Sequence, residues 1–376
     1  MKATGTGQKR LKYFQKTAQN ILQFGKYAYL CTRYRKRFAN GVVVQLVRIP
    51  ACHAGGRGFE SRPPRHPRYK SSPSFYIDIF QRFCIKKFRK VHIELTNICN
   101  LSCSFCPPQI LPKHTMPLEL FENINRQLQP YTKELAYHIM GDPLVVNNLA
   151  SYLDISAKYD LKVNITTSAN NLKRQMYGML AHDAIKQINF SINSYNANSH
   201  KKSLQEYLAP ILEFCSYVLE EKKEFFINLR VWNFDEEQSA KAFNKEVFER
   251  INDHFGTSID AQTIYAHKPN NIKVARKIFL HFEEYFAWPS LQAPRIGDRG
   301  FCYGLSSHFG ILSSGRVVPC CLDKDGVIDL GDLNSQSVAE VLASKRAVAV
   351  QEGFKDRRAV EELCQKCEYR TRFELL

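Results

Sequence analysis

Three cysteines lie close together in one short segment of the sequence. Residues 91–108 read VHIELTNICNLSCSFCPP, in which Cys99, Cys103 and Cys106 have the spacing C-x3-C-x2-C. Three thiolates on one loop can bind three irons of a cubane [4Fe–4S] cluster and leave the fourth iron without a protein ligand. Such an iron is open to a second molecule, so the spacing predicts a reaction site.

A zinc site and an electron-carrying cluster are two other possible uses of these cysteines. A zinc site would need a fourth nearby Cys or His, and a ferredoxin-type electron carrier normally has four cysteine ligands. No further cysteine follows within the segment, and His114 is the nearest downstream candidate.

A second group of cysteines occupies the C-terminal part of the chain. Its members are Cys302, Cys320, Cys321, Cys364 and Cys367. The Gly-x4-Cys step from Gly315 predicts a β-hairpin with its turn at 313–315, whose returning strand leads to Cys320. Four cysteines from separated segments make a closed site, because the protein can fill every metal position.

The first motif, with an aromatic residue before its last cysteine and a strand before its loop, resembles the radical S-adenosylmethionine (SAM) superfamily. The resemblance implies that SAM chelates the open iron through its amino and carboxylate groups. One electron from the reduced cluster then cleaves the S–C5′ bond, and the 5′-deoxyadenosyl radical abstracts hydrogen from a substrate. The protein orients these groups and excludes water. An external electron donor of the flavodoxin or ferredoxin type is the expected partner.

Residues 300–376 resemble the SPASM or twitch type of auxiliary domain, including its Pro-Cys-Cys element and a short helix at 337–343. By this resemblance we expect one auxiliary [4Fe–4S] cluster. Its expected ligands are Cys302, Cys320, Cys364 and Cys367, with Cys321 either replacing Cys320 or remaining a free thiol. No cysteine follows Cys367, so a second auxiliary cluster is not expected. Zinc is the chemical alternative, because four thiolates also suit a tetrahedral site.

Strand-like and helix-like stretches alternate between the two motifs and predict an α/β fold. The expected strands are 91–96, 133–139, 162–166, 188–192, 225–231 and 261–266. The expected helices are 118–128, 149–158, 172–181, 204–219 and 236–251. We therefore expect a partial (β/α)6 TIM-like barrel over residues 88–285, followed by a small iron–sulfur domain with a β-hairpin over 300–376. Ligands of such barrels meet the C-terminal ends of the strands.

Candidate SAM contacts follow from these strand ends. Gly141 and Asp142 stand at the place of the family's Gly-Gly-Glu-like segment, although Gly-Asp-Pro alone is a turn signal. Thr167, Ser191 and Asn193 offer hydroxyl and amide groups for ribose and carboxylate oxygens, with helix capping as the competing explanation.

Two further residues complete the expected SAM site. Arg230 lies on an otherwise apolar strand and needs an anionic partner, either the SAM carboxylate or a barrel carboxylate such as Glu94. Phe105 occupies the position whose backbone commonly meets adenine in the family, or it is a core aromatic. No catalytic acid, base or radical relay can be named.

The positive charge of the chain is confined to its N-terminal part. The net charge is +17, yet residues 1–90 hold 21 Lys and Arg against two acidic residues, and the other 286 residues hold 32 basic and 34 acidic ones. Nucleic acid is therefore not an expected partner of the main part. The absence of a signal sequence and of a long apolar run predicts a cytoplasmic protein without membrane spans and with reduced thiols.

Residues 41–68 resemble a translated transfer-RNA gene. Allowed codons for residues 50–55 can spell an anticodon stem and loop for aspartate, and those for 58–61 contain the GTTCGA of a T-loop. We expect residues 1–75 to be a disordered or spurious basic extension, with the working protein starting around residues 69–80. A basic arm that binds RNA or an acidic membrane surface is the alternative.

The expected function is that of a radical SAM enzyme. Auxiliary domains of this type often accompany peptide or protein modification, which makes a peptide or protein one candidate substrate. A radical SAM step in cofactor or small-molecule biosynthesis is a second hypothesis. A non-catalytic iron–sulfur carrier or scaffold, which would bind no SAM, is a third.

Overall fold

The structure is a computed structural model that describes residues 87–199, 202–234 and 241–373. Residues 86–376 form one compact unit. The prediction of a basic extension over residues 1–75 lies outside the described residues. Among the helices that are described, none has the length and apolar character needed to cross a membrane.

The described elements alternate along the chain. The strands are β1 (Lys90–Ile93), β2 (Glu134–Tyr137), β3 (Lys162–Thr167), β4 (Ile185–Ser191), β5 (Phe226–Val231), β6 (Asn271–Ala275), β7 (Ile278–Phe282), β8 (His308–Ile311), β9 (Arg316–Val318) and β10 (Gly331–Asp332). The α-helices are α4 (Leu118–Leu128), α5 (Leu149–Lys158), α6 (Tyr177–Leu180), α7 (Asn193–Asn196), α8 (Leu204–Glu220), α9 (Lys241–Phe255), α10 (Ala261–His267), α11 (Val338–Leu342), α12 (Lys345–Lys355) and α13 (Glu362–Gln365). The 3-10 helices are η4 (Pro143–Val145), η5 (Arg174–Met176) and η6 (Glu368–Phe373).

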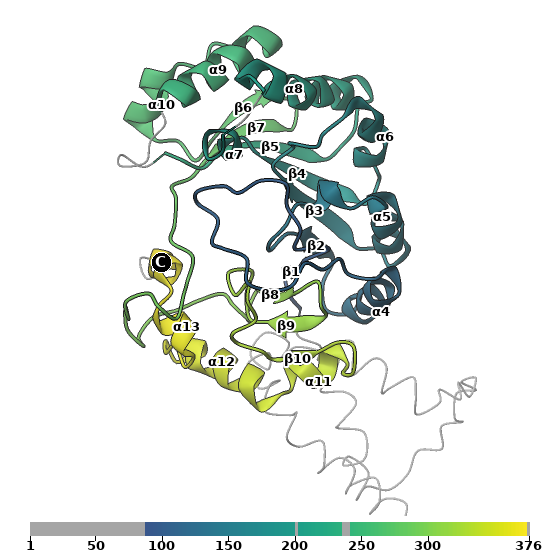
Figure 1. Ribbon diagram of the computed structural model, residues 1–376, viewed down its shortest axis with the longest axis vertical. Helices are drawn as coiled ribbons and strands as arrows, with labels where there is room; N and C mark the ends of the chain where they lie inside the picture. The colour runs from purple at the N-terminus through teal and green to yellow at the C-terminus, as the bar shows by residue number, and fades with distance from the viewer. Residues whose placement is uncertain (1–86, 200–201, 235–240, 374–376) are drawn as a thin grey trace, which may run out of the picture. The chain divides into compact units, whose positions relative to one another are not determined.

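One curved sheet runs through the whole unit, in the order β10-β9-β8-β1-β2-β3-β4-β5-β7-β6. Strands β1 to β5 and β7 pair in parallel, as the predicted barrel requires. Helices α4, α5, α6 and α8 lie along the outer side of the sheet, and the loop after β1 lies in its concave side (Figure 1). The sheet is open between β6 and β10, so it forms a partial barrel.

The prediction of a strand at 261–266 was wrong, because this segment forms α10. Thr263, Ile264 and Tyr265 have side chains that favour strands. However, Asp260 caps a helix there, since its carboxylate accepts hydrogen bonds from the backbone N–H and the hydroxyl of Thr263, both at 2.7 Å. The sixth parallel strand is β7, which pairs with β5.

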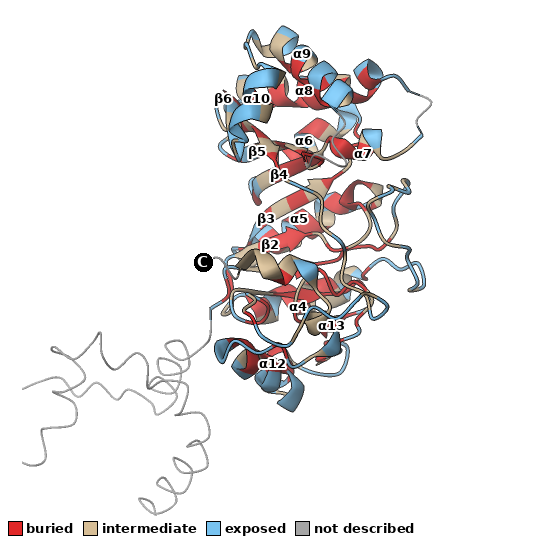
Figure 2. Ribbon diagram, turned by 90° about the vertical axis from the view of Figure 1, so that its left-hand side faces the viewer, coloured by how far each residue is buried: buried red, intermediate tan, exposed pale blue. Residues whose placement is uncertain are grey.

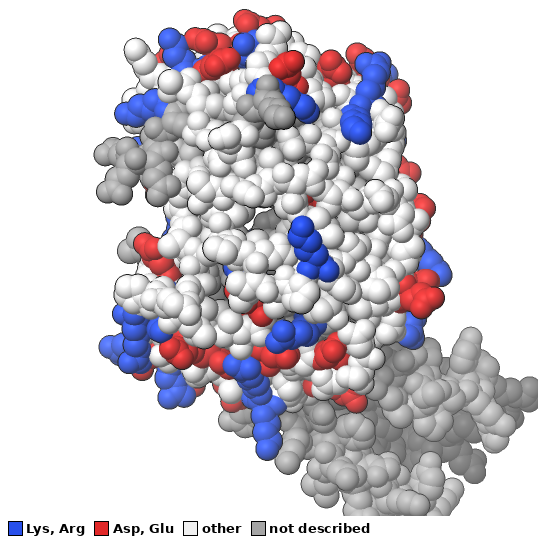
Figure 3. Space-filling model, in the orientation of Figure 1, with Lys and Arg blue, Asp and Glu red and all other residues white. Residues whose placement is uncertain are grey.

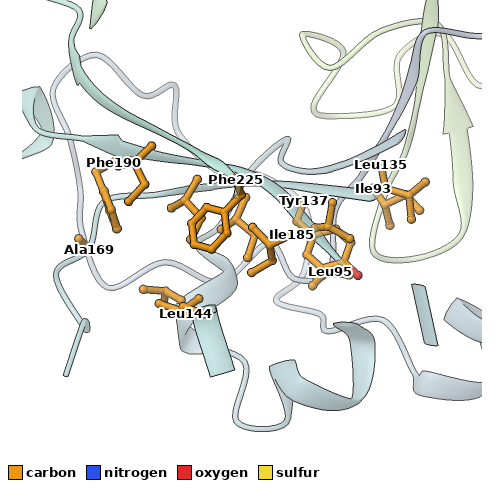
Figure 4. Packing of buried hydrophobic residues seen from close by; sticks show 14 of the residues in the cluster. Ile93, Leu95, Leu135, Tyr137, Leu144, Ala169, Ile185, Phe190 and Phe225 are labelled. Atoms are coloured by element: carbon orange, nitrogen blue, oxygen red, sulfur yellow. The ribbon is translucent and has the colours of Figure 1, made fainter. Parts of the chain in front are cut away.

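The core lies between the outer side of the sheet and its helices, and buried residues form a continuous band there (Figure 2). Every second residue of β3 and β5 is buried, while the residues between them, which face the inside of the barrel, are half-buried. Ile93, Leu135, Tyr137, Ile185 and Phe190 pack in this core (Figure 4). The inner side of the sheet is therefore the side that can hold polar ligands.

The C-terminal hairpin continues the barrel sheet. Strand β8 pairs in parallel with β1, which places His308 opposite Lys90 and Gly310 opposite His92. Strand β9 returns antiparallel to β8, and Gly315 occupies the intervening turn with φ +94°. The predicted hairpin is thus confirmed, and it shares a sheet with the barrel.

Candidate active site

The loop with the first cysteine triad leaves the C-terminal end of β1 and occupies the concave side of the sheet (Figure 1). Cys99 and Cys106 are exposed and Cys103 is half-buried. The backbone N–H of Cys106 donates to the carbonyl of Cys103 at 3.0 Å, which folds the loop into a tight turn. All three thiols thus belong to one accessible loop, as the spacing predicts.

The loop is held from one side by the segment that follows β4. The backbone N–H of Ser104 donates to the carbonyl of Ala197 at 3.1 Å, and that of Ser102 donates to Oδ1 of Asn198 at 2.9 Å. The amide nitrogen of Asn198 donates to Sγ of Cys103 at 3.0 Å. Hydrogen bonds to a sulfur stabilise its thiolate form and tune a bound cluster. Asn198 was not singled out from the sequence, because its contact depends on a segment 95 residues away.

Gly141 holds the loop from the other side. Its φ is +71°, and a Cβ atom built on it would lie 2.2 Å from the carbonyl oxygen of Thr96. The next backbone N–H, that of Asp142, donates to the carbonyl of Ile98 at 2.9 Å. Only glycine permits both this φ and this approach, so the turn after β2 fixes the start of the cysteine loop.

The carboxylate of Asp142 connects the ends of β2 and β3. It is 5% exposed and accepts hydrogen bonds from Leu144 N, from the hydroxyl of Thr167, and from both the backbone N–H and the hydroxyl of Ser168, at 2.7 to 2.9 Å. The expected contacts of Asp142 and Thr167 with SAM stay predictions, and both side chains are already bonded to each other. Their observed role is to position the two strand ends.

Ser191 and Asn193 lie at the end of β4 and the start of α7. Ile192 occupies the N-cap position of α7, and no side chain makes a capping hydrogen bond there. Helix capping therefore does not explain the polar residues at this strand end. The pairing of β4 with β5 sets Ser191 opposite Arg230, so the structure brings these two predicted contacts together.

Arg230 carries an unpartnered donor on the inner side of β5. Its guanidinium lies 4.4 Å from the ring centroid of Trp232, and within the described part of the chain its buried Nε has no hydrogen-bond partner. Burial lowers the pKa of Arg230 to about 10, which keeps the group charged at neutral pH. The alternative pairing with Glu94 is wrong, because that carboxylate accepts from Ser313 N and Oγ and from Met140 N.

Phe105 is half-buried and lies outside the main core. Its ring centroid is 5.5 Å from that of Tyr285, on the segment that follows β7. The explanation of Phe105 as a core aromatic is therefore not supported.

The four predicted auxiliary ligands, Cys302, Cys320, Cys364 and Cys367, gather beside the hairpin. Gly304 lies between two of them, because a Cβ atom on it would be 3.8 Å both from Sγ of Cys302 and from Cβ of Cys320. Burial raises the pKa of Cys302 to about 11, and burial together with neighbouring thiols raises the pKa values of Cys320 and Cys364 well above the ordinary thiol value. A bound cationic centre would stabilise these thiolates.

No three of the seven predicted cluster thiols lie within 4.8 Å of one another in the described part of the chain. A zinc ion with sulfur ligands at about 2.3 Å would bring the sulfurs within about 4 Å of one another. Among the described residues, the one set of three or more ligand atoms that all lie within 4.8 Å is His92, His138 and Cys321, and it contains none of the seven predicted cluster ligands.

A group of buried histidines on the inner side of the sheet was missed by the sequence analysis. His92 lies on β1, His138 follows β2, and His308 begins β8. The ring centroid of His92 is 5.9 Å from that of His138 and 5.5 Å from that of His308. Burial lowers the pKa of His138 to about 3 and that of His308 to about 4, so both rings are neutral at physiological pH.

The family comparison agrees with the C-terminal geometry. The profile of the SPASM iron–sulfur cluster-binding domain matches residues 302–368, which contain all four predicted auxiliary ligands. The C-terminal part of the chain is therefore similar to SPASM iron–sulfur cluster-binding domains.

Solved structures are similar to this chain in fold. SuiB of Streptococcus suis is 15% identical, with a TM-score of 0.50, over 79% of this chain and 76% of SuiB. BtrN in complex with AdoMet and 2-DOIA is 14% identical, with a TM-score of 0.48, over 76% and 94% of the two chains. The anSMEcpe protein with bound AdoMet is 13% identical, with a TM-score of 0.48, over 77% and 85%. No curated protein sequence gives a significant match.

The segment that matches the SPASM profile is bonded directly to the residues on either side of the first cysteine triad. Ser313, in the hairpin turn, donates to Glu94 from its backbone N–H at 3.1 Å and from its hydroxyl at 2.8 Å. The ammonium of Lys324 donates to the carbonyl of Pro108, just beyond the cysteine triad, at 2.9 Å, and pairs with Asp325 at 2.6 Å. The position of the triad loop thus depends on the segment that matches the SPASM profile.

Proposed function

We propose that this chain is a radical SAM enzyme, which binds a [4Fe–4S] cluster through Cys99, Cys103 and Cys106, binds SAM beside it, and cleaves SAM reductively. The observation that carries the proposal is the placement of three accessible thiols on one loop at the C-terminal ends of the strands. When bound, the reduced cluster supplies the electron that breaks the S–C5′ bond and yields a 5′-deoxyadenosyl radical.

The residues of this chain would bind and orient SAM. The unpartnered Nε of Arg230 supplies a charge-assisted donor for the SAM carboxylate. Ser191, opposite Arg230 in the sheet, adds a hydroxyl for the same ligand. Gly141 and Asp142 hold the turn against which the cysteine loop packs. The ring contact between Phe105 and Tyr285 joins the loop to the segment that follows β7.

We propose a second, SPASM-bound [4Fe–4S] cluster on Cys302, Cys320, Cys364 and Cys367. Its support is the match of the SPASM profile to residues 302–368, which contain all four cysteines. Cys320 comes from the segment that follows β9, and Cys364 and Cys367 lie at and just after α13. An external electron donor of the flavodoxin or ferredoxin type would reduce the clusters.

For the substrate we propose a peptide or protein segment. Support comes from the SPASM domain and from the fold shared with SuiB, a protein that has also been solved with its precursor peptide SuiA. On the face seen in Figure 3, charged side chains gather at the upper and lower ends, and the middle is almost free of them. Such a face suits a polypeptide segment with few charges.

The first experiment tests SAM cleavage. The chain is reconstituted anaerobically with iron and sulfide, reduced with dithionite and mixed with SAM, and 5′-deoxyadenosine is measured by mass spectrometry. We expect about eight irons per chain, as two four-iron clusters require, and 5′-deoxyadenosine as product. Replacing Cys99, Cys103 and Cys106 by Ala should abolish the product and leave about four irons, whereas Cys215→Ala, at a thiol buried in α8, should change neither. Failure to cleave SAM with the first cluster intact would favour a carrier or scaffold.

A second experiment tests the substrate class. Extracts from cells grown in deuterated medium are separated into a polypeptide fraction and a small-molecule fraction, and each is added to the reaction. Hydrogen abstraction from a true substrate transfers deuterium into 5′-deoxyadenosine. We expect this transfer with the polypeptide fraction and its loss after protease digestion. Transfer from the small-molecule fraction alone would contradict the peptide proposal and favour a biosynthetic step on a small molecule.

A further inference from the structure

A second set of metal-binding side chains lies on the inner side of the sheet. His92 comes from β1, His138 follows β2 and Cys321 follows β9. One ligand atom from each of the three lies within 4.8 Å of those of the other two. These residues are separate from the cysteine triad and from the four predicted auxiliary ligands. Their approach depends on the pairing of β8 with β1 and of β1 with β2.

Hydrogen bonding does not account for this approach. His92 is 7% exposed, and within the described residues its Nδ1 atom is buried without a hydrogen-bond partner. A buried polar atom left unpaired costs about 1–3 kcal/mol, so such atoms are rare unless a ligand or water satisfies them. The buried carboxylate of Glu94, which directly follows β1, is already bonded to Ser313 and Met140.

We propose that His92, His138 and Cys321 bind one zinc ion, in addition to the iron–sulfur clusters. Two imidazole nitrogens and one thiolate are a ligand set that zinc accepts, at about 2.0–2.1 Å for nitrogen and 2.3 Å for sulfur. These bond lengths bring tetrahedral ligand atoms to about 3.5 Å from one another. The three ligand atoms lie within 4.8 Å of one another, so small side-chain rotations would bring them to this separation.

Three protein ligands leave a fourth position on the ion. Zinc sites that take part in reactions keep this position for water or a substrate group, whereas structural zinc sites have four protein ligands. Lys90 and Arg230 are the cationic neighbours of this group, the former acting on Cys321 and both acting on His138. An anionic fourth ligand, such as hydroxide or a substrate carboxylate, therefore fits the site.

The proposal gives the Pro-Cys-Cys element two separate functions. Cys320 lies beside Cys302 across Gly304 and belongs to the SPASM cysteine set. The next residue, Cys321, belongs to the set with His92 and His138. Two consecutive thiols would thus hold two different centres and fix the distance between them.

The test measures zinc directly and does not depend on SAM cleavage. The full chain is produced with zinc in the medium, reconstituted anaerobically with both clusters and treated with a mild chelator, and zinc and iron are counted together. We expect about one zinc per chain. Cys321→Ser and His138→Gln should each weaken zinc retention by a factor of at least about ten without changing the iron count. Cys215→Ala and His254→Gln, at sites away from this set, should retain zinc like the unmodified chain.

X-ray absorption at the zinc edge keeps the proposal testable if a variant fails to fold. The unmodified chain should show a mixed nitrogen and sulfur shell. A shell of four sulfurs would place zinc in the SPASM cysteine set and overturn the proposal. So would the absence of zinc from a chain with both clusters, or a loss of about four irons in Cys321→Ser, which would make Cys321 a cluster ligand. A chain that holds zinc but does not cleave SAM would contradict only the proposed function.

Discussion

Replacing Asp142 by Asn removes the bond network that joins the ends of β2 and β3. Asn keeps one oxygen and presents an NH2 group in place of the other, so either Leu144 N or Ser168 N loses its acceptor. A buried donor left unpaired costs about 1–3 kcal/mol. The remaining bonds also fall from charge-assisted to neutral strength, a loss of about 1 kcal/mol each. With one donor unpaired and the other three weakened, these effects together predict a loss of about 4–6 kcal/mol of folding free energy.

This loss can be measured as the thermal unfolding midpoint of the cluster-loaded chain under anaerobic conditions at a fixed scan rate. A loss of this size should lower the midpoint by roughly 8–24 °C, since 1 kcal/mol corresponds to about 2–4 °C in a large domain. The control is Asp154→Asn, whose exposed carboxylate contacts only His182, at 3.1 Å, and whose midpoint should move by less than about 2 °C. If the midpoint of Asp142→Asn moved as little as that of the control, the carboxylate of Asp142 would not stabilise the ends of β2 and β3.

Three other predictions follow from the site. Gly141→Ala places a Cβ atom 2.2 Å from a backbone oxygen at a positive φ, so we expect the variant to lose the triad cluster and about four irons per chain. The matched control is Gly178→Ala, whose added Cβ atom has no neighbour within 4 Å and which should keep all irons. Arg230→Lys should weaken SAM binding by roughly tenfold or more, measured by equilibrium dialysis, because Lys cannot reproduce the guanidinium geometry; unchanged affinity would exclude Arg230 as the carboxylate partner. The pKa of His308 is lowered to about 4 in the folded chain and is about 6.5 in the unfolded chain. Below pH 6.5 the unfolded chain therefore binds a proton that the folded chain does not, and the free energy of unfolding falls as the pH is lowered toward 4. Between pH 8 and 6 the free energy of unfolding should fall by about 0.8 kcal/mol more in the unmodified chain than in His308→Gln, measured by urea unfolding; equal slopes would contradict the assignment.

Much of the local structure could be predicted from the sequence, because helix and strand periodicity and capping are local properties. The helices expected at 118–128 and 149–158 are α4 and α5 with the same ends. The hairpin around Gly315 follows from its turn residues, and the short helix after it from the capping box between Ser337 and Glu340. The strand prediction at 261–266 was wrong for a local reason too, since β-branched side chains and a helix cap compete within this short segment.

Residue spacing by itself predicts the first cluster site. Three thiols at C-x3-C-x2-C indicate an iron–sulfur site, because ligands on one loop are close in space whatever the rest of the fold does. Only the tertiary structure decided what surrounds them. The pairing of β8 with β1 brings Ser313 to Glu94 across 219 positions of sequence, and sheet order brings Cys321 to His92 and His138. These contacts join residues from distant segments, and no local pattern of the sequence encodes which strands become neighbours.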